Sequence, residues 1–575
     1  MLNTKGKVVA QKKQTTVLAD LPFELPIPNL STGEYILQAT LAGSENYQTT
    51  LAIRKLVPKK GQVRIDENLT TYIDGKKFFP YGWFSIKEKH LQRAAAVGCN
   101  IHIEYNAYYR SDAELKRWLD KLQDEGFKVA MYPYPKKSYC VTESWVKPLS
   151  KTEADGIREF VRKWKNHPAL LGWYMADEPE LRPALPARMT AIYKICLDED
   201  PYHPCLLLND TLSGIRKYID TGDIFNPDPY PLFLRGGDAA WSIEKVGKFM
   251  DTILEAGQNR KAVWVTPQAF DYGDYGAINN RAPNFLELRN MQYQAIIAGA
   301  QGFTWFTWYA ALPYPEISNS MEYLTREAML LKNVILSPEK RTALETDQEL
   351  VRATTYGNID GQSYVFVVNN ATKPVNINLK LPKDSPSIWY VIGENRAVKM
   401  VQGAIQDEFG KYDVHLYTTD AKLAESISVA DTEKKIAAGI RALERLGNLA
   451  FRNKGVKIRY SSAKSTLNNS HIIDGCREDN GWIDKTYNEF PDWVVMEWNK
   501  PQTIARAEMF SDSVSRADLQ MKQDGKWETV ATFKRVSSSQ MTATFLPVKT
   551  DAVRLLVRNS RNGVTSVSEL EMYTK

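Results

Sequence analysis

Two adjacent acidic residues, Asp177 and Glu178, follow a run of mostly apolar and aromatic residues in the stretch GWYMADEPE, residues 172–180. A carboxyl group set among such side chains keeps its proton more readily than one in water, so it can serve as a general acid near neutral pH. Cleavage of a glycosidic bond needs such an acid to protonate the leaving oxygen. We therefore predict that Glu178 is a general acid/base, with Asp177 as its partner.

Polar and aromatic residues also end other short apolar runs of the chain. Aromatic rings stack on the apolar face of a sugar ring while amides and carboxylates bind its hydroxyls, so this composition predicts a carbohydrate pocket. Asp228 in NPDPYP is the third catalytic candidate, and no Cys or His cluster among the strand ends suggests a metal site. The predicted substrate-binding residues are Glu104, Asn106, Tyr132, Asn209, Tyr230, Gln268, Trp305 and Trp308.

Each candidate also has a purely structural interpretation. The Asp-Glu pair could cap the helix expected near 186–200, and Asp228 could shape a proline turn. Trp305 and Trp308 lie three residues apart, so on a strand they face opposite sides and at most one enters a common pocket. We expect the other to lie in the core.

The residues from Phe78 to about Ser337 alternate short apolar runs with amphipathic helical patterns such as DAELKRWLDKLQDEG, which Gly126 ends. Eight such strand–helix units predict a (β/α)8 TIM barrel. An open doubly wound sheet is the alternative, but no glycine-rich phosphate turn follows the first strand. In a barrel the carboxyl ends of all strands share one mouth, which would bring the candidate residues together.

Segments with the alternating pattern of β-strands flank this barrel, so the predicted fold class is multidomain α/β plus all-β, a central barrel flanked by β-sandwich domains. The pair Asp524-Gly525 between LQMKQ and KWETVATF predicts a hairpin in the last segment. The predicted order is an N-terminal β-sandwich at 1–60, the barrel at 61–340, a β-sandwich at 341–424, a helical connector at 425–447 and a further β-sandwich at 448–575.

Composition and charge limit the classes of partner that the protein is expected to bind. A net charge of +6 over 575 residues, without a basic block, does not imply nucleic acid, and no apolar run has the length of a membrane span. Five cysteines without metal-ligand spacing predict free buried thiols. The first residues, MLNTKGKVVAQKKQ, lack a signal peptide core; we expect a trimmed leader and a periplasmic or extracellular protein. The oligomeric state stays open.

At its strand-end residues the central segment resembles the glycoside hydrolases built on (β/α)8 barrels. In their large retaining clan the fourth strand ends in Asn-Glu, with Glu as acid/base, and the seventh ends in a nucleophilic Glu. This chain departs twice from that pattern, because Asp177 precedes Glu178 and the seventh strand ends in TPQAF with Gln268. An amide cannot form the glycosyl ester of a double displacement.

The Asp177-Glu178 pair also resembles the hexosaminidases and related enzymes that use substrate assistance. That resemblance implies that Glu178 is the acid/base and that Asp177 orients the substrate's 2-acetamido group, whose carbonyl oxygen attacks the anomeric carbon. It implies that Tyr230 holds the acetamido oxygen. No protein nucleophile is then required.

The last 125 or so residues resemble a discoidin-type domain of the coagulation factor 5/8 type, the fold of one group of carbohydrate-binding modules. The matching motifs are Asn448-Leu449-Ala450, Ile473-Asp474-Gly475, DWVVMEW, GKWETVATF, AVRLLV and VSELEMY. The resemblance implies a jelly-roll that binds sugar or only stabilises the chain, and it allows a structural calcium ion; no other cofactor is expected. As a sugar-binding module it would add effective concentration on a polymer and no chemistry.

Three functions stay open at this point. The first is a substrate-assisted glycosidase that uses Asp177 and Glu178. The second is an inverting or retaining glycosidase on a non-acetamido sugar such as a galactoside, with Asp228 or Glu104 as the second carboxylate. The third is a glycan-binding protein without activity. In each case the expected partner is an oligosaccharide or polysaccharide.

Overall fold

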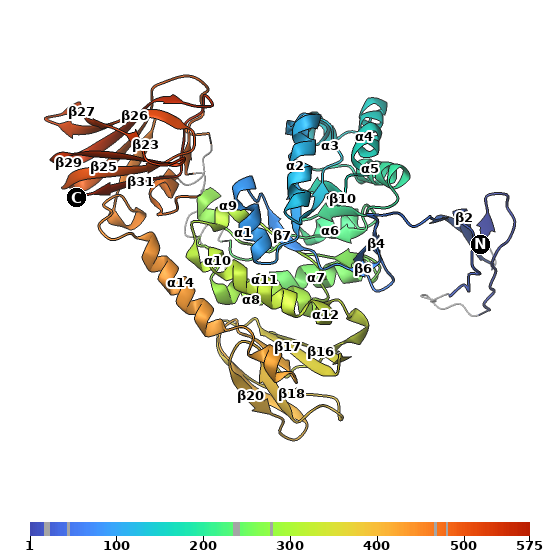
Figure 1. Cartoon of the computed structure of the whole chain (residues 1–575). Helices are drawn as coiled ribbons and strands as arrows, with labels where there is room; N and C mark the ends of the chain where they lie inside the picture. Colours follow the sequence, from blue (N-terminus) through green and yellow to red (C-terminus); the bar gives the residue numbers. More distant parts are fainter. Residues whose placement is uncertain (16–23, 43–46, 234–241, 276–279, 465–468, 479–480) are drawn as a thin grey trace. The chain divides into compact units, whose positions relative to one another are not determined.

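The computed structural model describes residues 1–15, 24–42, 47–233, 242–275, 280–464, 469–478 and 481–575. The chain divides into two compact units, Met1–Gln62 and Val63–Lys575. Figure 1 shows the elements in chain order. None of the helices in the described ranges combines the length and the apolar character that crossing a bilayer requires.

The N-terminal unit is a three-stranded antiparallel sheet of β1 (Leu2–Asn3), β2 (Gly33–Leu41) and β3 (Tyr47–Lys55). The strands predicted from alternation are therefore present, in a register that pairs Tyr35 with Ile53. Apolar side chains such as Leu51 are exposed, and among the described residues of this unit no second sheet covers them. Alternation predicted the strands but not a partner layer, so the expected sandwich is a single sheet here.

Eight parallel strands of the second unit form the predicted barrel. They pair in chain order, β14 pairs with β7, and the parallel bridges Val265↔Phe303 and Gln268↔Phe306 join the extension of β13 to β14 and close the circle. The strands are β7 (Tyr81–Phe84), β8 (Ile101–Glu104), β9 (Lys128–Met131), β10 (Leu170–Asp177), β11 (Cys205–Leu208), β12 (Ile224–Phe225), β13 (Ala262–Val263) and β14 (Phe303–Trp305).

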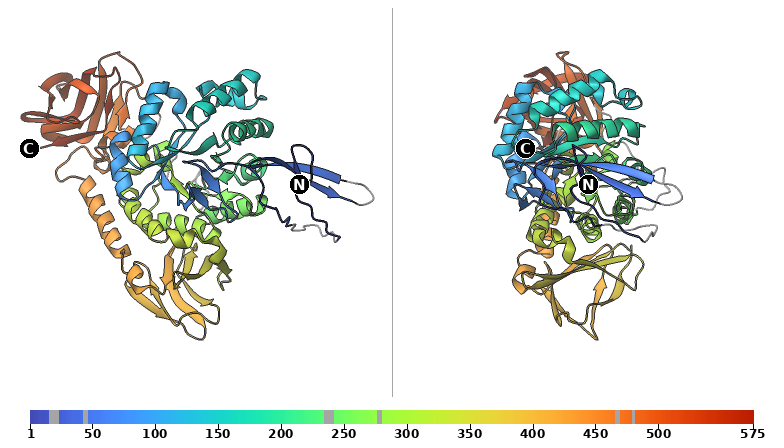
Figure 2. Two further views of the ribbon diagram at one scale, coloured as in Figure 1. Left: turned by 45° about the vertical axis from the view of Figure 1, so that its right-hand side comes forward. Right: turned by 90° about the vertical axis from the view of Figure 1, so that its right-hand side faces the viewer.

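Helices surround this barrel, as Figures 1 and 2 show. The helix predicted from DAELKRWLDKLQDEG is α2, which Ser111 and Glu114 start with a capping box, worth about 1 kcal/mol. Gly126, just beyond its end, takes a left-handed φ of 82°. The helices of six or more residues between the strands are α1 (Leu91–Ala96), α2 (Asp112–Asp124), α4 (Lys151–Trp164), α5 (Pro186–Glu199), α6 (Leu212–Tyr218), α7 (Lys245–Ala256) and α8 (Phe285–Ala298), and α11 (Ser320–Leu330) lies beyond β14.

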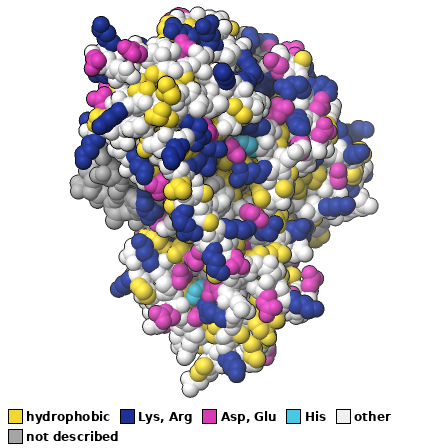
Figure 3. Space-filling model, turned by 60° about the vertical axis from the view of Figure 1, so that its left-hand side comes forward, with side chains coloured by type: hydrophobic (Ala, Val, Ile, Leu, Met, Phe, Trp, Pro, Cys, Tyr) yellow, Lys and Arg dark blue, Asp and Glu magenta, His cyan; other side chains and the backbone are white. Residues whose placement is uncertain are grey.

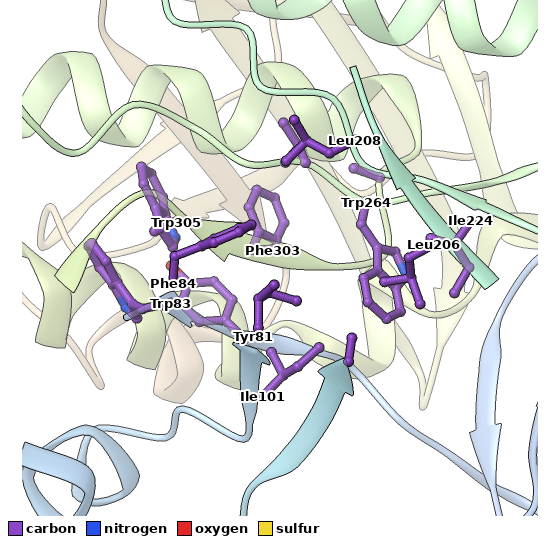
Figure 4. Packing of buried hydrophobic residues seen from close by; sticks show 14 of the residues in the cluster. Tyr81, Trp83, Phe84, Ile101, Leu206, Leu208, Ile224, Trp264, Phe303 and Trp305 are labelled. Atoms are coloured by element: carbon purple, nitrogen blue, oxygen red, sulfur yellow. The ribbon is translucent and has the colours of Figure 1, made fainter. Parts of the chain in front are cut away.

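Large side chains fill the barrel. Figure 4 shows Tyr81, Trp83 and Trp305 among the packed residues, and the rings of Trp83 and Trp305 stack with centroids 5.7 Å apart. The Trp305 indole N–H donates to the Tyr81 hydroxyl over 3.0 Å, which in turn donates to Gln292 over 2.7 Å. The barrel is therefore a packed core, and chemistry is confined to its mouth.

A β-rich segment follows the barrel and packs on α8. Its six-stranded and two-stranded sheets share one hydrophobic cluster that includes Val365, Ile377 and Ile405. The larger sheet consists of β15 (Arg341–Leu344), β16 (Val351–Ile359), β17 (Gln362–Asn369), β22 (Val414–Thr418), β19 (Ile388–Val391) and β20 (Arg396–Lys399), and the smaller of β18 (Val375–Lys380) and β21 (Ala404–Phe409). The predicted connector is helix α14 (Val429–Leu443).

The C-terminal module, defined as residues 448–575, is all-β. Its hairpin at Asp524-Gly525 is confirmed, with φ of 47° and 80° at the two positions, which is the backbone of a type I′ turn. Its main sheet contains β23 (Lys457–Tyr460), β25 (Asp492–Phe510), β29 (Gln540–Ser560), β26 (Val514–Gln523) and β27 (Lys526–Thr532), with β28 (Lys534–Arg535) and β31 (Glu569–Tyr573) at its sides; β24 (Trp482–Ile483) pairs with β30 (Ser566–Val567).

Two sequence predictions concern the whole chain. All five cysteines are buried thiols outside any disulfide, as expected. Basic and acidic side chains are interspersed over the face drawn in Figure 3. This mixture agrees with the absence of a basic block in the sequence.

Candidate active site

Three carboxylates meet at the mouth of the barrel. Glu178, Asp210 and Asp228 follow the carboxyl ends of β10, β11 and β12, and one oxygen of each lies within 4.8 Å of an oxygen of the other two. Adjacent parallel strands end at the same face, so the topology alone brings these residues together. Two of the three, Glu178 and Asp228, are among the predicted catalytic residues.

The backbone turns sharply at Glu178. The residue has a φ of 47°, in the left-handed region that side chains other than Gly, Asn and Asp rarely adopt. Its amide N–H donates to the Leu208 carbonyl over 3.2 Å, which fixes the turn on β11. Such a conformation costs about 1–3 kcal/mol and is held only where the surroundings impose it. The turn separates the carboxylate of Glu178 from that of Asp177.

The surroundings of Glu178 raise its pKa to about 7, first through burial and then through the negative charge of Asp177. Asp228 is almost completely buried, and its pKa is raised well above the usual value by burial and by the charges of Glu178 and Asp210. No described residue donates to the Asp228 Oδ1 atom. Two carboxyl groups so close repel each other when both are ionised, so the loss of the second proton is disfavoured.

The turn that carries Asp210 is held by Glu180, which was not among the predicted site residues. Glu180 accepts hydrogen bonds from the Asn209 amide over 2.7 Å and from the Asp210 backbone N–H over 2.8 Å. A methyl group on Gly214 would lie 2.3 Å from a Glu180 oxygen, so the glycine leaves room for this contact. The signal was present in the same motif, two residues after Glu178.

Asp177 faces the other side of the mouth. The Tyr174 hydroxyl donates to its Oδ1 atom over 2.6 Å, and the Arg182 guanidinium donates to its backbone carbonyl over 2.9 Å and lies 3.4 Å from its Oδ2 atom. Tyr132 stacks on Tyr174 with centroids 5.2 Å apart and planes 11° apart. Tyr174 and Arg182 therefore fix the orientation of Asp177 at the end of β10.

Aromatic rings line the mouth next to the carboxylates. Tyr230 packs edge-on against Phe270 at 5.0 Å and lies 6.1 Å from Phe306, between ring centroids. Tyr272 completes this group, and its pKa is raised by burial and then by the charges of Asp210, Asp228 and Glu178. Tyr230 was predicted, whereas Phe270, Tyr272 and Phe306 were missed because they follow the strand ends by one or more residues.

Glu104 points away from the mouth. It accepts hydrogen bonds from the Trp118 indole over 2.7 Å and from the Asn106 backbone N–H over 2.9 Å, and Trp118 belongs to helix α2 outside the barrel. Burial opposes its ionisation, but His102 and Arg110 hold its pKa below the usual value. His102, two residues earlier on β8, also contacts Trp118, with ring centroids 5.5 Å apart, so by the period of two both side chains face α2. This placement removes Glu104 as a partner for Glu178.

Gln268 joins two loops. Its amide oxygen accepts from the Leu232 N–H over 2.9 Å, and its amide nitrogen donates to the carbonyls of Leu232 and Phe270, each over 3.2 Å. Both of its donors are therefore used inside the protein. Asn209 donates from its amide nitrogen to Glu180, but no described residue donates to its amide oxygen, so Asn209 keeps an acceptor at the mouth whereas the donors of Gln268 are used.

Trp305 and Trp308 are both core residues. Strand β14 ends at Trp305, and Trp308 begins the short helix α9 (Trp308–Ala311), where its indole donates to His90 Nδ1 over 2.9 Å. The period of two did not apply because the strand had ended. The ring of this segment that reaches the mouth is Phe306, which is only half-buried and lies beside Tyr230.

The three carboxylates also have the chemistry of a cation site. Oxygen ligands from Glu178, Asp210 and Asp228 would suit a hard divalent cation such as Ca²⁺ or Mg²⁺. A cation and a shared proton are alternative ways to relieve the same repulsion. Chelation experiments separate the two.

No family model matches the sequence, and no curated protein matches it. Solved structures with similar folds include a family 5 glycoside hydrolase from Bacteroides vulgatus, at 13% identity over 65% of this chain and 98% of that one, with a TM-score of 0.46. A family 39 glycoside hydrolase from Bacteroides cellulosilyticus is 15% identical over 69% of this chain and 90% of that one, with a TM-score of 0.40.

A carbohydrate-binding module from Clostridium perfringens that was solved with GalNAc-β-1,3-galactose is similar to a part of this chain. The identity is 21% over 22% of this chain and 99% of that one, with a TM-score of 0.20. At these values the similarities do not decide the activity of this chain. Its own residues have to do so.

Proposed function

We propose that this chain is a glycoside hydrolase in which Glu178 and Asp228 are the catalytic carboxyl pair. The observation that carries the proposal is their meeting at the barrel mouth, with both pKa values raised, beside the rings of Tyr230 and Tyr272. Hydrolysis of a glycoside needs one carboxyl group protonated and another group that stabilises the positive anomeric carbon. A pair that shares one proton supplies both at neutral pH.

In our proposal the pair acts with retention of configuration. Inverting enzymes separate their carboxyl groups by about 6.5–9.5 Å to hold a water molecule, and retaining enzymes by about 5–5.5 Å. Here the nearest oxygens of Glu178 and Asp228 lie within 4.8 Å. In our proposal the proton that the pair shares is on Glu178 when the glycoside is bound, so Glu178 protonates the leaving oxygen while the ionised Asp228 attacks the anomeric carbon, and water then cleaves the ester with Glu178 as base.

One observation favours a second candidate, substrate assistance. Asp177 is hydrogen-bonded to Arg182 and Tyr174, and it adjoins the proposed acid. A 2-acetamido group whose N–H binds Asp177 could attack the anomeric carbon in place of Asp228. The leaving oxygen would still take its proton from Glu178.

Two inhibitors distinguish the candidates once a glycan panel has identified a substrate. An activated 2-deoxy-2-fluoro glycoside should accumulate as an ester on Asp228, detectable by mass spectrometry of the peptide, if Asp228 is the nucleophile. A thiazoline should inhibit strongly if the acetamido group attacks, and Asp177→Asn should then weaken its binding. Glycan binding without any hydrolysis by the wild-type chain would overturn the proposed activity.

A further inference from the structure

A buried histidine of the C-terminal module lies between two aspartates. His471 Nδ1 is 2.8 Å from Asp474 Oδ2 in the same module, and His471 Nε2 is 3.2 Å from Asp274 Oδ1 in the barrel. Burial opposes its protonation, but hydrogen bonds to Asp274 and Asp474 outweigh burial and raise the pKa of His471 to about 11. The imidazole is therefore a cation that both carboxylates bind at neutral pH.

Asp274 belongs to the loop that carries Phe270 and Tyr272, two of the aromatic residues at the barrel mouth, which we call the aromatic wall. This loop, residues 270–275, follows the seventh strand of the barrel and includes the short helix Tyr272–Tyr275. Phe270 packs against Tyr272 with centroids 4.8 Å apart, and the Tyr314 hydroxyl donates to Asp274 over 2.7 Å. Asp274 is thus the point where the wall meets the module.

A second contact lies beside the first. Glu478 of the module is 3.2 Å from the Arg93 guanidinium and 3.6 Å from His90 Nε2, and His90 accepts the Trp308 indole hydrogen bond. Arg93 belongs to α1, which follows the first strand, so both contacts are with segments that follow carboxyl ends of barrel strands. The module therefore packs on the face that carries the carboxylates.

We propose that His471 is a positioning residue for the active site, which holds Asp274 so that Phe270 and Tyr272 stand beside Glu178 and Asp228. The module then builds one wall of the substrate pocket and is more than a tethered sugar-binding appendage. The expected effect of this contact on kinetics rests on the proposed function. Its structural consequence, the ordering of residues 270–275, does not depend on any activity.

Full-length variants test the inference from both sides of the contact. His471→Ala removes the cation and Asp274→Asn removes its partner in the barrel. His415→Ala is the matched control, because His415 is also buried and lies 3.0 Å from a carboxylate, that of Asp407, within the β-rich segment after the barrel. Circular dichroism and unfolding midpoints establish that each variant is folded.

Hydrogen exchange of the peptide covering 270–275 is the first measurement. It should be faster in His471→Ala and Asp274→Asn than in the wild type and unchanged in His415→Ala. If His471→Ala and Asp274→Asn are both folded and exchange the 270–275 peptide as slowly as the wild type, the inference is overturned, whatever the activity. Should His471→Ala fail to fold, the exchange rate in Asp274→Asn alone decides between the two outcomes.

Kinetics on a small soluble glycoside are the second measurement. We expect kcat/KM to fall roughly 10- to 100-fold in either variant, since a misplacement of about 1 Å in a site can cost on the order of 10²-fold. The double variant should be no worse than the single ones, because both remove one interaction. Additive losses would mean that His471 acts through some other group. Absence of hydrolysis by the wild type would refute the proposed function and leave the exchange result to decide the inference.

Discussion

At the scale of single residues, the candidate site depends on the surroundings of Glu178, Asp228 and Asp177. The left-handed turn at Glu178 aims its carboxylate toward Asp228 and leaves Asp177 facing Arg182. Burial and the neighbouring negative charges raise the pKa of both Glu178 and Asp228, while Asp177 pairs with the Arg182 guanidinium. Neighbouring residues of one motif thus have different partners because the backbone turns between them.

Replacing the proposed acid should affect poor substrates most. We expect Glu178→Gln to lower kcat for an unactivated glycoside by roughly 10²-fold or more, since general acid catalysis contributes about 10² to 10⁴. A dinitrophenyl glycoside, whose leaving group needs no proton, should lose far less. Steady-state kinetics on both substrates check this, and equal losses on the two would count against Glu178 as the acid.

The same substitution should stabilise the protein at high pH. A carboxyl group whose pKa rises from 4.5 to about 7 on folding binds more protons in the folded state, so stability falls as pH rises between those values. Glu178→Gln removes that penalty, which is at most about 3 kcal/mol. Urea unfolding of both proteins at pH 5 and pH 8 should show the variant more stable only at the higher pH. A variant less stable than wild type at pH 8 would contradict the burial of this charge.

At the scale of elements, the sequence predicted strand ends well and side-chain direction less well. Glu178 and Asp228 were found because apolar runs end in front of them, and Tyr230 follows directly. Glu104 ends its run in the same way, yet the two-residue period of β8 turns it outward onto α2. The two-residue period alone does not tell from the sequence which residue at a strand end enters the mouth, because bulges and early strand ends shift the register.

Loop contacts were beyond prediction for a different reason. Glu180, Gln268 and Asp274 each act through at least one partner 29 or more residues away along the chain. A single sequence contains no signal for such pairs. Gln268 was therefore interpreted by comparison with a nucleophile, whereas its contacts make it a link between two loops.

Replacing Gln268 by glutamate, the nucleophile of the retaining enzymes at the end of the seventh strand, should not raise the activity. In Gln268→Glu the two carbonyls of Leu232 and Phe270 lose their donor and a buried charge faces them, so we expect a loss of at least about 2 kcal/mol of stability. Activity should not rise. Gln406→Glu, at an exposed position of β21, is the control for the added charge. Urea unfolding measures the loss, and a more active variant would reopen the seventh strand as a source of the nucleophile.

At the scale of the whole second unit, helix α8 joins the barrel to the β-rich segment that follows it. Arg289 on α8 binds both oxygens of Glu327 on α11, at 2.8 and 3.1 Å, and donates to the Val414 carbonyl of β22 over 2.7 Å. Asn290, the next residue, donates to two carbonyls of the β-rich segment. The helix is buried on all sides, so the two regions share their core there.

Breaking this buried pair should destabilise both regions together. Glu327→Gln leaves Arg289 as a buried charge without its anion, which typically costs about 3–5 kcal/mol. We expect a single cooperative transition in both experiments. It should lie at a lower temperature in calorimetry and at a lower denaturant concentration in fluorescence. Lys116→Ala, which removes an exposed pair with Asp120, should change stability by less than about 1 kcal/mol. A separate early transition for one region would show that α8 does not couple them.

The five buried thiols described above make the chain its own reporter of partial unfolding. Burial raises the pKa of Cys99 to about 12 and that of Cys140 to about 11, so a reagent that reacts with thiolates cannot label them until the surrounding structure opens. Cys99, Cys140, Cys196 and Cys205 lie in the barrel, and Cys476 lies in the C-terminal module next to Asp474. The order in which alkylation modifies these residues would therefore tell which region of the molecule opens first, without any engineered probe.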